Sequence, residues 1–140
     1  MNRIGLAIAE RLGHEGAKIV VSSRKEENVQ EGMKCLLKSG LKNSDICGCT
    51  CHVSKIEDRQ KLLETTLKRF GKVDILVNNA GINPHFGDIL DITESVWDKL
   101  FEVNVKAGFL LTKLFVPELA KNGLAEAEIY KFNPVIKVKV

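Results

Sequence analysis

Long apolar runs are missing from this sequence, and no stretch of its 140 residues approaches the ~20 consecutive apolar residues that a membrane span needs. The amino terminus also lacks the basic segment and apolar core of a secretory signal. Strong charge of one sign is absent too, because the net charge is +3 and basic residues are interleaved with acidic ones. We therefore expect a protein with no membrane span and no nucleic-acid-binding surface.

Cysteine is scarce outside one short segment. The four cysteines are Cys35, Cys47, Cys49 and Cys51. The last three lie two residues apart, so on a strand they share one face, where adjacent members are poorly placed to bridge each other. A disulfide framework and a metal cluster with His52 are alternatives, but we expect plain buried thiols and no metal site. This cysteine usage predicts an intracellular, cytoplasmic setting.

Helical and strand patterns alternate along the chain, and 140 residues are enough for one domain. Helices are expected at Ile4–Glu15, from the capping-box pattern Ser23-x-x-Glu26 to Ser39, from a second pattern Ser54-x-x-Glu57 to Gly71, and from Thr93 or Glu94 to Asn122. Strands are expected at Ala17–Ser22, Asp45–Val53 and Val73–Val77, the last buried on both faces. This alternation predicts an α/β fold with a doubly wound parallel sheet.

Small and amide residues follow the last predicted strand directly, as Asn78-Asn79-Ala80-Gly81. Such residues at the carboxyl end of a parallel strand let a ligand approach the backbone closely. This segment resembles a signature of the short-chain dehydrogenase/reductase family. Asn104-Val105 and Ser22-Ser23-Arg24-Lys25 resemble two further signatures, in the same order and at the same spacing.

The resemblance runs from about Ile4 to Gly123. The segments Val20–Val29 and Trp97–Lys99 are most similar to the NADPH-dependent carbonyl/retinal reductase branch, often found in peroxisomes. It implies a Rossmann-like domain and an NADP(H)-dependent oxidoreductase whose substrates are small carbonyl compounds or alcohols. The chain ends in Val-Lys-Val, so no peroxisomal import signal of the Ser-Lys-Leu type is present.

Both ends depart from the family pattern. Met1–Gly5 lies where the family has Gly-x-x-x-Gly-x-Gly, so that only Gly5 is retained and Arg3 stands for the middle glycine. We expect a truncated fold that lacks its first, central strand, which would leave the strand edges on either side of it unpaired. The predicted organisation is a partial dinucleotide-binding domain at 1–123 and a divergent tail at 124–140, in which Val135–Val140 alternates like an edge strand or is unfolded.

The catalytic residues of the family are the second departure. The resemblance implies a serine and a Tyr-x-x-x-Lys pair, but the single tyrosine, Tyr130, is followed directly by Lys131 and, four residues on, by Pro134. Neighbours in sequence point about 100° apart on a helix and cannot share a face. We expect little or no turnover by this chain, since losing a general acid typically costs about 10²–10⁴-fold.

Candidate cofactor contacts fall at the amino ends of the first two helices. Ile4 and Gly5 begin the first helix, where free N–H groups attract a pyrophosphate; a plain helix start is the alternative. Ser23, Arg24 and Lys25 follow the first predicted strand with no acid before Glu26. A hydroxyl, a guanidinium and an ammonium group suit a 2′-phosphate, so NADP(H) is favoured over NAD(H).

Further candidates come from the resemblance. His52 and Val53 end a predicted strand where the family more often has Asp-Val facing the adenine; a histidine could stack or donate a hydrogen bond there, or be a simple strand-end residue. Asn79, Ala80 and Gly81 are implied to flank the cofactor ribose.

A polar residue interrupts the apolar face of the last predicted helix. Asn104 occupies the position that the family uses to hold a water in the proton relay, and a purely structural polar residue is the alternative. The helix of residues 93–120 is implied to pair with a second chain, in a homo- or hetero-oligomer. Two hypotheses therefore stand beside the enzyme: a non-catalytic dinucleotide-binding or dimer-partner protein that modulates the full-length enzyme, and an incomplete product that barely folds.

Overall fold

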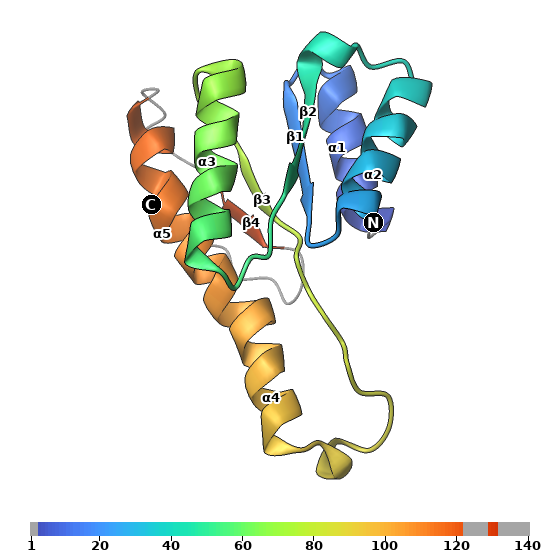
Figure 1. Cartoon of the computed structure of the whole chain (residues 1–140), viewed down its shortest axis with the longest axis vertical. Coiled ribbons are helices and arrows are strands. Elements are labelled where there is room, and N and C mark those ends of the chain that lie inside the picture. Colours follow the sequence, from blue (N-terminus) through green and yellow to red (C-terminus); the bar gives the residue numbers. More distant parts are fainter. Residues whose placement is uncertain (1–2, 122–128, 132–140) are drawn as a thin grey trace. The chain divides into compact units, whose positions relative to one another are not determined.

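The computed structural model describes residues 3–121 and 129–131 (Figure 1). The chain divides into two compact units, Met1–Lys72 and Val73–Val140, and each is described by itself. The first contains α1 (Arg3–His14), β1 (Ile19–Ser23), α2 (Glu26–Lys38), the 3-10 turn η1 (Asn43–Asp45), β2 (Ile46–Thr50) and α3 (Ile56–Phe70). The second contains β3 (Leu76–Asn78), the 3-10 turn η2 (Ile89–Asp91), α4 (Glu94–Phe101), the π-helical turn η3 (Glu102–Lys106), α5 (Ala107–Lys121) and β4 (Ile129–Lys131).

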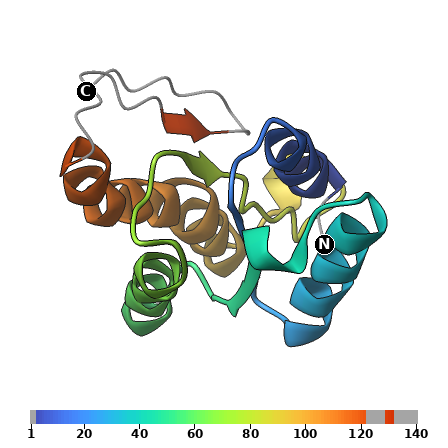
Figure 2. The same cartoon turned by 90° about the horizontal axis from the view of Figure 1, so that it is seen from above.

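The first unit is built on two parallel strands, β1 and β2, whose register runs from Ile19↔Ile46 to Ser23↔Thr50. Helices α1 and α2 lie together beside this pair (Figures 1 and 2). Their shared core is formed by apolar side chains of both helices and both strands, among them Ala9, Ile19, Val21, Leu36 and Ile46. The predicted α/β fold with parallel strands is therefore confirmed.

The two faces of β2 are covered by different helices. A Cβ atom built at Gly48 would lie 2.6 Å from Val29 Cγ1 of α2, so this position has room only for glycine. The next side chain, Cys49, points to the opposite face. Its Sγ lies 3.9 Å from Thr65 Oγ1 of α3. The unit is thus doubly wound, as the sequence predicts.

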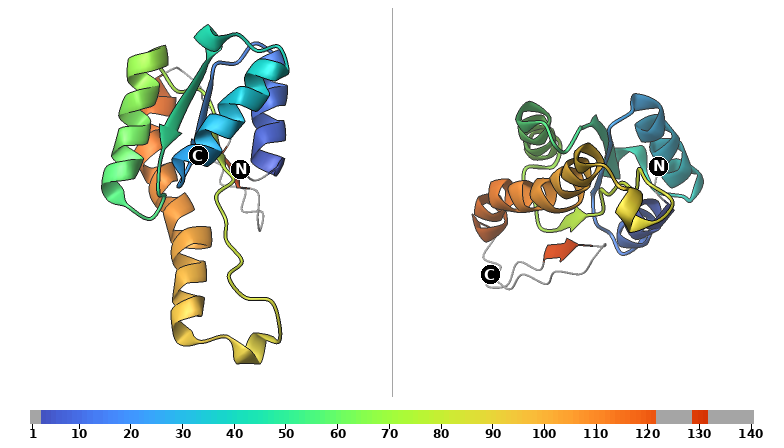
Figure 3. Two further views of the ribbon diagram at one scale, coloured as in Figure 1. Left: turned by 45° about the vertical axis from the view of Figure 1, so that its right-hand side comes forward. Right: turned by 90° about the horizontal axis from the view of Figure 1, so that it is seen from below.

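The second unit pairs β3 with β4 in parallel, with Leu76 opposite Ile129. Helix α4, the turn η3 and α5 form one continuous rod (Figure 3). Thr93 caps the rod, because its Oγ1 accepts a hydrogen bond from Val96 N–H, as expected for a helix that starts there. Its buried side chains recur every four residues: Val103, Ala107, Leu111, Phe115 and Leu119. The sequence did not predict the π-helical turn.

Both predicted capping boxes are wrong. The N-cap residues of α2 and α3 are Lys25 and Lys55, and neither makes a side-chain capping bond. Ser23 is instead the last residue of β1, where pairing with Thr50 holds its backbone extended. Ser54 lies in the turn before α3, and its buried Oγ has no hydrogen-bond partner in the described part of the chain.

Strand boundaries also differ from the predictions. Strand β3 begins at Leu76 instead of Val73, and Ile75 is 48% exposed, so this segment is not buried on both faces. Strand β2 ends at Thr50, which leaves His52 and Val53 in the following turn. The tail strand expected at Val135–Val140 lies outside the described residues.

The cysteine prediction is correct for only part of the set. All four thiols are free; Cys49 and Cys51 are buried, but Cys35 is exposed and Cys47 is half-buried. Burial raises the pKa of Cys51 to about 11 and also raises the pKa of Cys49. The two buried thiols are therefore uncharged and poorly nucleophilic at neutral pH.

Within residues 3–121 no helix is both long enough and apolar enough to cross a bilayer.

Neighbouring leucines on α2 test the core of the first unit. Leu36 is fully buried and Leu37 is 42% exposed. We expect Leu36→Ala to lower the free energy of unfolding by about 2–5 kcal/mol, because it leaves a cavity in the core. Leu37→Ala, the matched control, should change it by less than about 1 kcal/mol. Urea denaturation followed by circular dichroism measures both, and equal effects would contradict this packing.

Candidate functional site

The carboxyl end of the β1–β2 pair brings together several of the predicted contacts. The ladder ends at Ser23↔Thr50 and is extended by a 2.9 Å hydrogen bond from Cys51 N–H to the Ser23 carbonyl oxygen. Arg24 and Lys25 follow as exposed residues that lead into α2. Within residues 3–121 neither makes an ion pair, so both charges are available to a ligand.

The nearest acid, Glu26, is engaged elsewhere. Its carboxylate accepts hydrogen bonds from Thr50 Oγ1 and, at 2.6 Å, from Gln30 Nε2. The bond from the Thr50 hydroxyl is the main cause that lowers the pKa of Glu26, so this group is ionised at neutral pH. Because both carboxylate oxygens have partners, Glu26 does not neutralise Arg24 or Lys25 by direct pairing.

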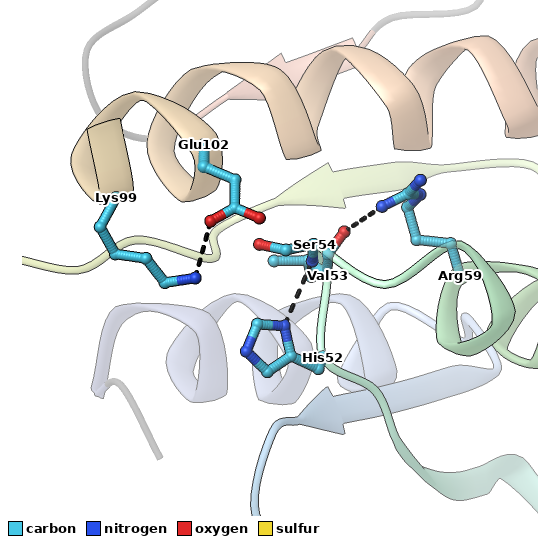
Figure 4. Close-up of polar contacts among 6 residues, drawn as sticks. All are labelled: His52, Val53, Ser54, Arg59, Lys99 and Glu102. Atoms are coloured by element: carbon cyan, nitrogen blue, oxygen red, sulfur yellow. Dashed lines mark hydrogen bonds and ion pairs between the residues drawn. The ribbon is translucent and has the colours of Figure 1, made fainter. Parts of the chain in front are cut away.

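His52 lies in a tightly bonded turn after β2 (Figure 4). Its N–H donates to Asp58 Oδ2 at 2.7 Å, and its carbonyl oxygen accepts from Lys55 N–H at 2.8 Å. The imidazole Nδ1 accepts from Ser54 N–H at 3.3 Å. These contacts replace the strand end that the sequence predicted for His52 and Val53.

A buried arginine closes this turn, and sequence reasoning missed it. Arg59 is 6% exposed, and its Nη1 donates to the Val53 carbonyl oxygen at 2.7 Å (Figure 4). The sequence does indicate this burial, because Arg59 lies three residues before the buried Leu62 and therefore on the apolar face of α3. A charged residue on that face needs a buried polar partner, and the Val53 carbonyl provides it.

The predicted pyrophosphate contacts lie in the first turn of α1. Ile4 is exposed and Gly5 is half-buried, and α1 carries no acid in this turn. The core face of the helix is formed by Leu6, Ala9 and Leu12. A helix start without acids in its first turn is compatible with an anionic ligand.

The second group of candidates follows β3. Asn78 is buried, and its Nδ2 donates to Thr112 Oγ1 of α5 at 3.3 Å, so this side chain joins the strand to the long helix. Asn79 is half-buried, while Ala80 and Gly81 are exposed, which leaves their backbone accessible.

Asn104 holds the loop after Gly81 in place. Its Oδ1 accepts from Ile82 N–H at 2.8 Å, and its Nδ2 donates to the Ile82 carbonyl oxygen at 2.9 Å. The side chain thus pairs with one residue's backbone as a neighbouring strand would. Asn104 is the middle residue of η3, and π-helical turns of this kind are frequent at functional sites.

An exposed ion pair lies on the same helical rod. Lys99 Nζ contacts Glu102 Oε2 at 2.7 Å, and both side chains are more than two-fifths exposed (Figure 4). A pair of this kind contributes little to stability. The two candidate groups, at the end of β1–β2 and after β3, belong to different units.

Comparison with known proteins gives consistent results. A family model described as short chain dehydrogenase matches residues 1–126. The chain is 54% identical over 120 residues to a Caenorhabditis elegans protein named dehydrogenase/reductase SDR family member 4, covering 86% of this chain and 45% of that protein. The human protein of the same name is 52% identical, with 86% and 42% covered. The chain thus spans about half the length of its curated relatives or less.

Solved structures share the fold. A variant of actinorhodin polyketide ketoreductase, determined with NADPH, superposes with a TM-score of 0.80 at 32% identity, covering 91% of this chain and 48% of that one. A Brucella melitensis 3-ketoacyl-(acyl-carrier-protein) reductase complexed with NADH gives 0.79 at 29% identity, with 91% and 51% covered. The doubly wound unit, the asparagine-containing loop after β3 and these matches lead to one conclusion: the chain belongs to the short-chain dehydrogenase family.

Proposed function

We propose that this chain is the cofactor-binding part of an NADP(H)-dependent oxidoreductase that acts on small carbonyl compounds or alcohols. The observation that carries the cofactor preference is the pair of exposed basic residues, Arg24 and Lys25, beside an acid that is already occupied. An acid free to bind a ribose 2′-hydroxyl would favour NAD(H), but both oxygens of Glu26 are bonded to Thr50 and Gln30.

The other candidates complete this proposal. Ile4 and Gly5 bind the pyrophosphate at the start of α1, and Ser23 stands with Arg24 and Lys25 at the 2′-phosphate. His52 and Val53 adjoin the adenine, and the backbone of Asn79, Ala80 and Gly81 flanks the ribose next to the nicotinamide. When bound, the nicotinamide ring supplies or accepts the hydride.

Asn104 is a positioning residue in this proposal. By pairing with both backbone groups of Ile82, it fixes the course of the Asn79–Gly81 loop. Both polar atoms of its side-chain amide are then engaged with Ile82, since Oδ1 accepts one hydrogen bond and Nδ2 donates another. The proposed proton relay would hold its water at this position.

Catalysis by the mechanism of the family needs a tyrosine followed four residues later by a lysine, and these 140 residues contain no such pair. The only tyrosine, Tyr130, adjoins Lys131 and has no lysine four residues later. We propose that this chain by itself binds the cofactor and turns over little or no substrate. An assay of NADPH oxidation with a carbonyl compound should give no rate above the blank, and a protein-dependent rate would contradict this.

The second part of the proposal is that this chain forms an oligomer through its long helix. Such pairing would let it act as a binding partner of related chains. The apolar residues Trp97, Phe101, Val105 and Phe109 are 40% to 64% exposed and recur every four residues along the helical rod. We propose that they pair with a second chain. Light scattering should then show a dimer that Phe101→Glu converts to a monomer, whereas a monomeric wild type would contradict the pairing.

Cofactor preference is tested by thermal unfolding. NADPH at about 100 times its dissociation constant should add roughly 2.7 kcal/mol to the free energy of unfolding. NADH at the same concentration should add less, because its dissociation constant is higher. Replacing both Arg24 and Lys25 by alanine should weaken NADPH binding about 10- to 100-fold, because charge-assisted bonds to the phosphate are lost, and should leave NADH binding unchanged. Lys38→Ala, at the far end of α2, is the control. Equal stabilisation of the wild type by both cofactors would refute the preference.

The role of Asn104 is tested by removing its amide. Asn104→Ala leaves both backbone groups of Ile82 without their partner, so we expect a loss of about 1–3 kcal/mol in unfolding free energy. Binding of NADPH should weaken as well, because the Asn79–Gly81 loop is released. Lys106→Ala, an exposed change in the same π-helical turn, should alter neither. Unfolding in urea and calorimetric titration report the two effects separately.

A further inference from the structure

We propose that Thr50 and Gln30 determine the cofactor preference of this chain by holding the carboxylate of Glu26. We call these two hydrogen-bond donors the Glu26 clamp. While the clamp is closed, the positive charges of Arg24 and Lys25 face an anionic ligand unopposed. The inference rests on the proposed dinucleotide binding and deepens it, because it assigns the preference to two positioning residues that act through a third.

The Glu26 clamp joins the start of α2 to the end of β2. Glu26 is the first residue of α2, and Thr50 is the last residue of β2, where it pairs with Ser23 of β1. The Thr50 hydroxyl donates to Glu26 Oε2. Gln30 Nε2, one turn further along α2, donates to Glu26 Oε1 at 2.6 Å. Each carboxylate oxygen thus has its own donor, so the carboxylate cannot leave this position without breaking both bonds.

The clamp controls the position of a charge and does not remove it. The hydrogen bond from Thr50 is the first cause that lowers the pKa of Glu26, followed by the bond from Gln30, while Lys61 makes a smaller contribution. Glu26 is therefore a carboxylate at neutral pH. Because the Coulomb energy varies inversely with distance, halving the separation between this carboxylate and a phosphate would double their repulsion. The place where Glu26 is held thus decides how strongly it opposes a phosphate.

A second contact of α2 prepares the hydroxyl of Ser23. Asn28 Nδ2 donates to Ser23 Oγ at 3.4 Å. A serine hydroxyl has one proton to donate, and its oxygen can accept as well. Within residues 3–121 this proton has no acceptor, so it can be donated to an anion. The two contacts from α2 therefore act together: one leaves a donor for a phosphate, and the other withholds an acid from it.

Release of Glu26 would change the two cofactors differently. A carboxylate that is free at this edge accepts a hydrogen bond from a ribose 2′-hydroxyl and repels a 2′-phosphate. It can also pair with Arg24 or Lys25 and so reduce the charge offered to the phosphate. Both effects weaken the binding of NADPH, and neither weakens the binding of NADH. The clamp therefore acts on the ratio of the two affinities.

The clamp is tested first without a ligand. Thr50→Val combined with Gln30→Leu removes both donors and nearly keeps the size of each side chain. Carbon-13 NMR titration of the Glu26 carboxyl group should show a pKa that rises toward its ordinary value in this double variant, because bonds to the charged form are lost. Gln60→Leu, an exposed change on α3, is the control and should leave that pKa unchanged. An equal pKa of Glu26 in the wild type and the double variant would contradict the clamp.

Cofactor binding tests the consequence. Calorimetric titration should show the double variant binding NADPH about 3- to 10-fold more weakly than the wild type, without weaker binding of NADH. Thr50→Ser, which keeps the hydroxyl, should bind NADPH like the wild type. Adding Glu26→Gln to the double variant should restore the affinity for NADPH, because no charge is then left to release. Glu26→Gln alone should change it by less than about twofold.

The outcomes separate this inference from the proposed function. A loss of NADPH affinity that persists after Glu26→Gln would mean that the double variant disturbs the fold, and it would overturn the role of the clamp. Unchanged NADPH affinity of the double variant would overturn it too, and in both cases the proposed function stands. A wild type that binds neither cofactor, or binds both equally, would contradict the proposed function and this inference with it.

Discussion

The parallel register of β1 and β2 is the constraint on which the first unit depends. It aligns Ser23 with Thr50 and thereby brings two segments, Ser23–Lys25 and the turn at His52, to the same edge. Burial of Ile19, Val21 and Ile46 among side chains of α1 and α2 stabilises that register, because a slip by one residue would turn the buried side chains of a strand toward the other face. The arrangement of polar groups at the edge is thus a consequence of apolar packing away from it.

In the second unit one amide takes over the function of a missing ladder partner. The loop after β3 leaves the sheet, and the backbone of Ile82 would otherwise need water or another strand. Asn104 satisfies both of its polar groups at once. It can do so from the middle of a helix because η3 widens the helical turn there, where an asparagine is otherwise unfavourable.

Much of the fold could be predicted from the sequence, because helix and strand periodicities reflect burial directly. Ends of elements were less predictable. The Ser-x-x-Glu patterns at Ser23 and Ser54 have the composition of capping boxes. Ser23 is instead held in β1 by its pairing with Thr50, and Ser54 lies in the turn that begins at His52. Those contacts are non-local, and a four-residue pattern cannot contain them. Asn104 was found because an amide on an apolar helix face is conspicuous; Arg59 was missed although it breaks the apolar face of α3 in the same way.

The π-helical turn also determines how the long helix may vary. It contains one residue more than an α-helical turn would, and each residue of an α-helix rotates the chain by about 100°. Loss of a single residue between Glu102 and Lys106 would therefore turn α4 by roughly that angle about its axis relative to α5. Trp97 and Phe101 would then face a new direction while Leu111, Phe115 and Leu119 kept theirs. The direction of the aromatic side chains of α4 is thus encoded by the number of residues in this segment as much as by their identity.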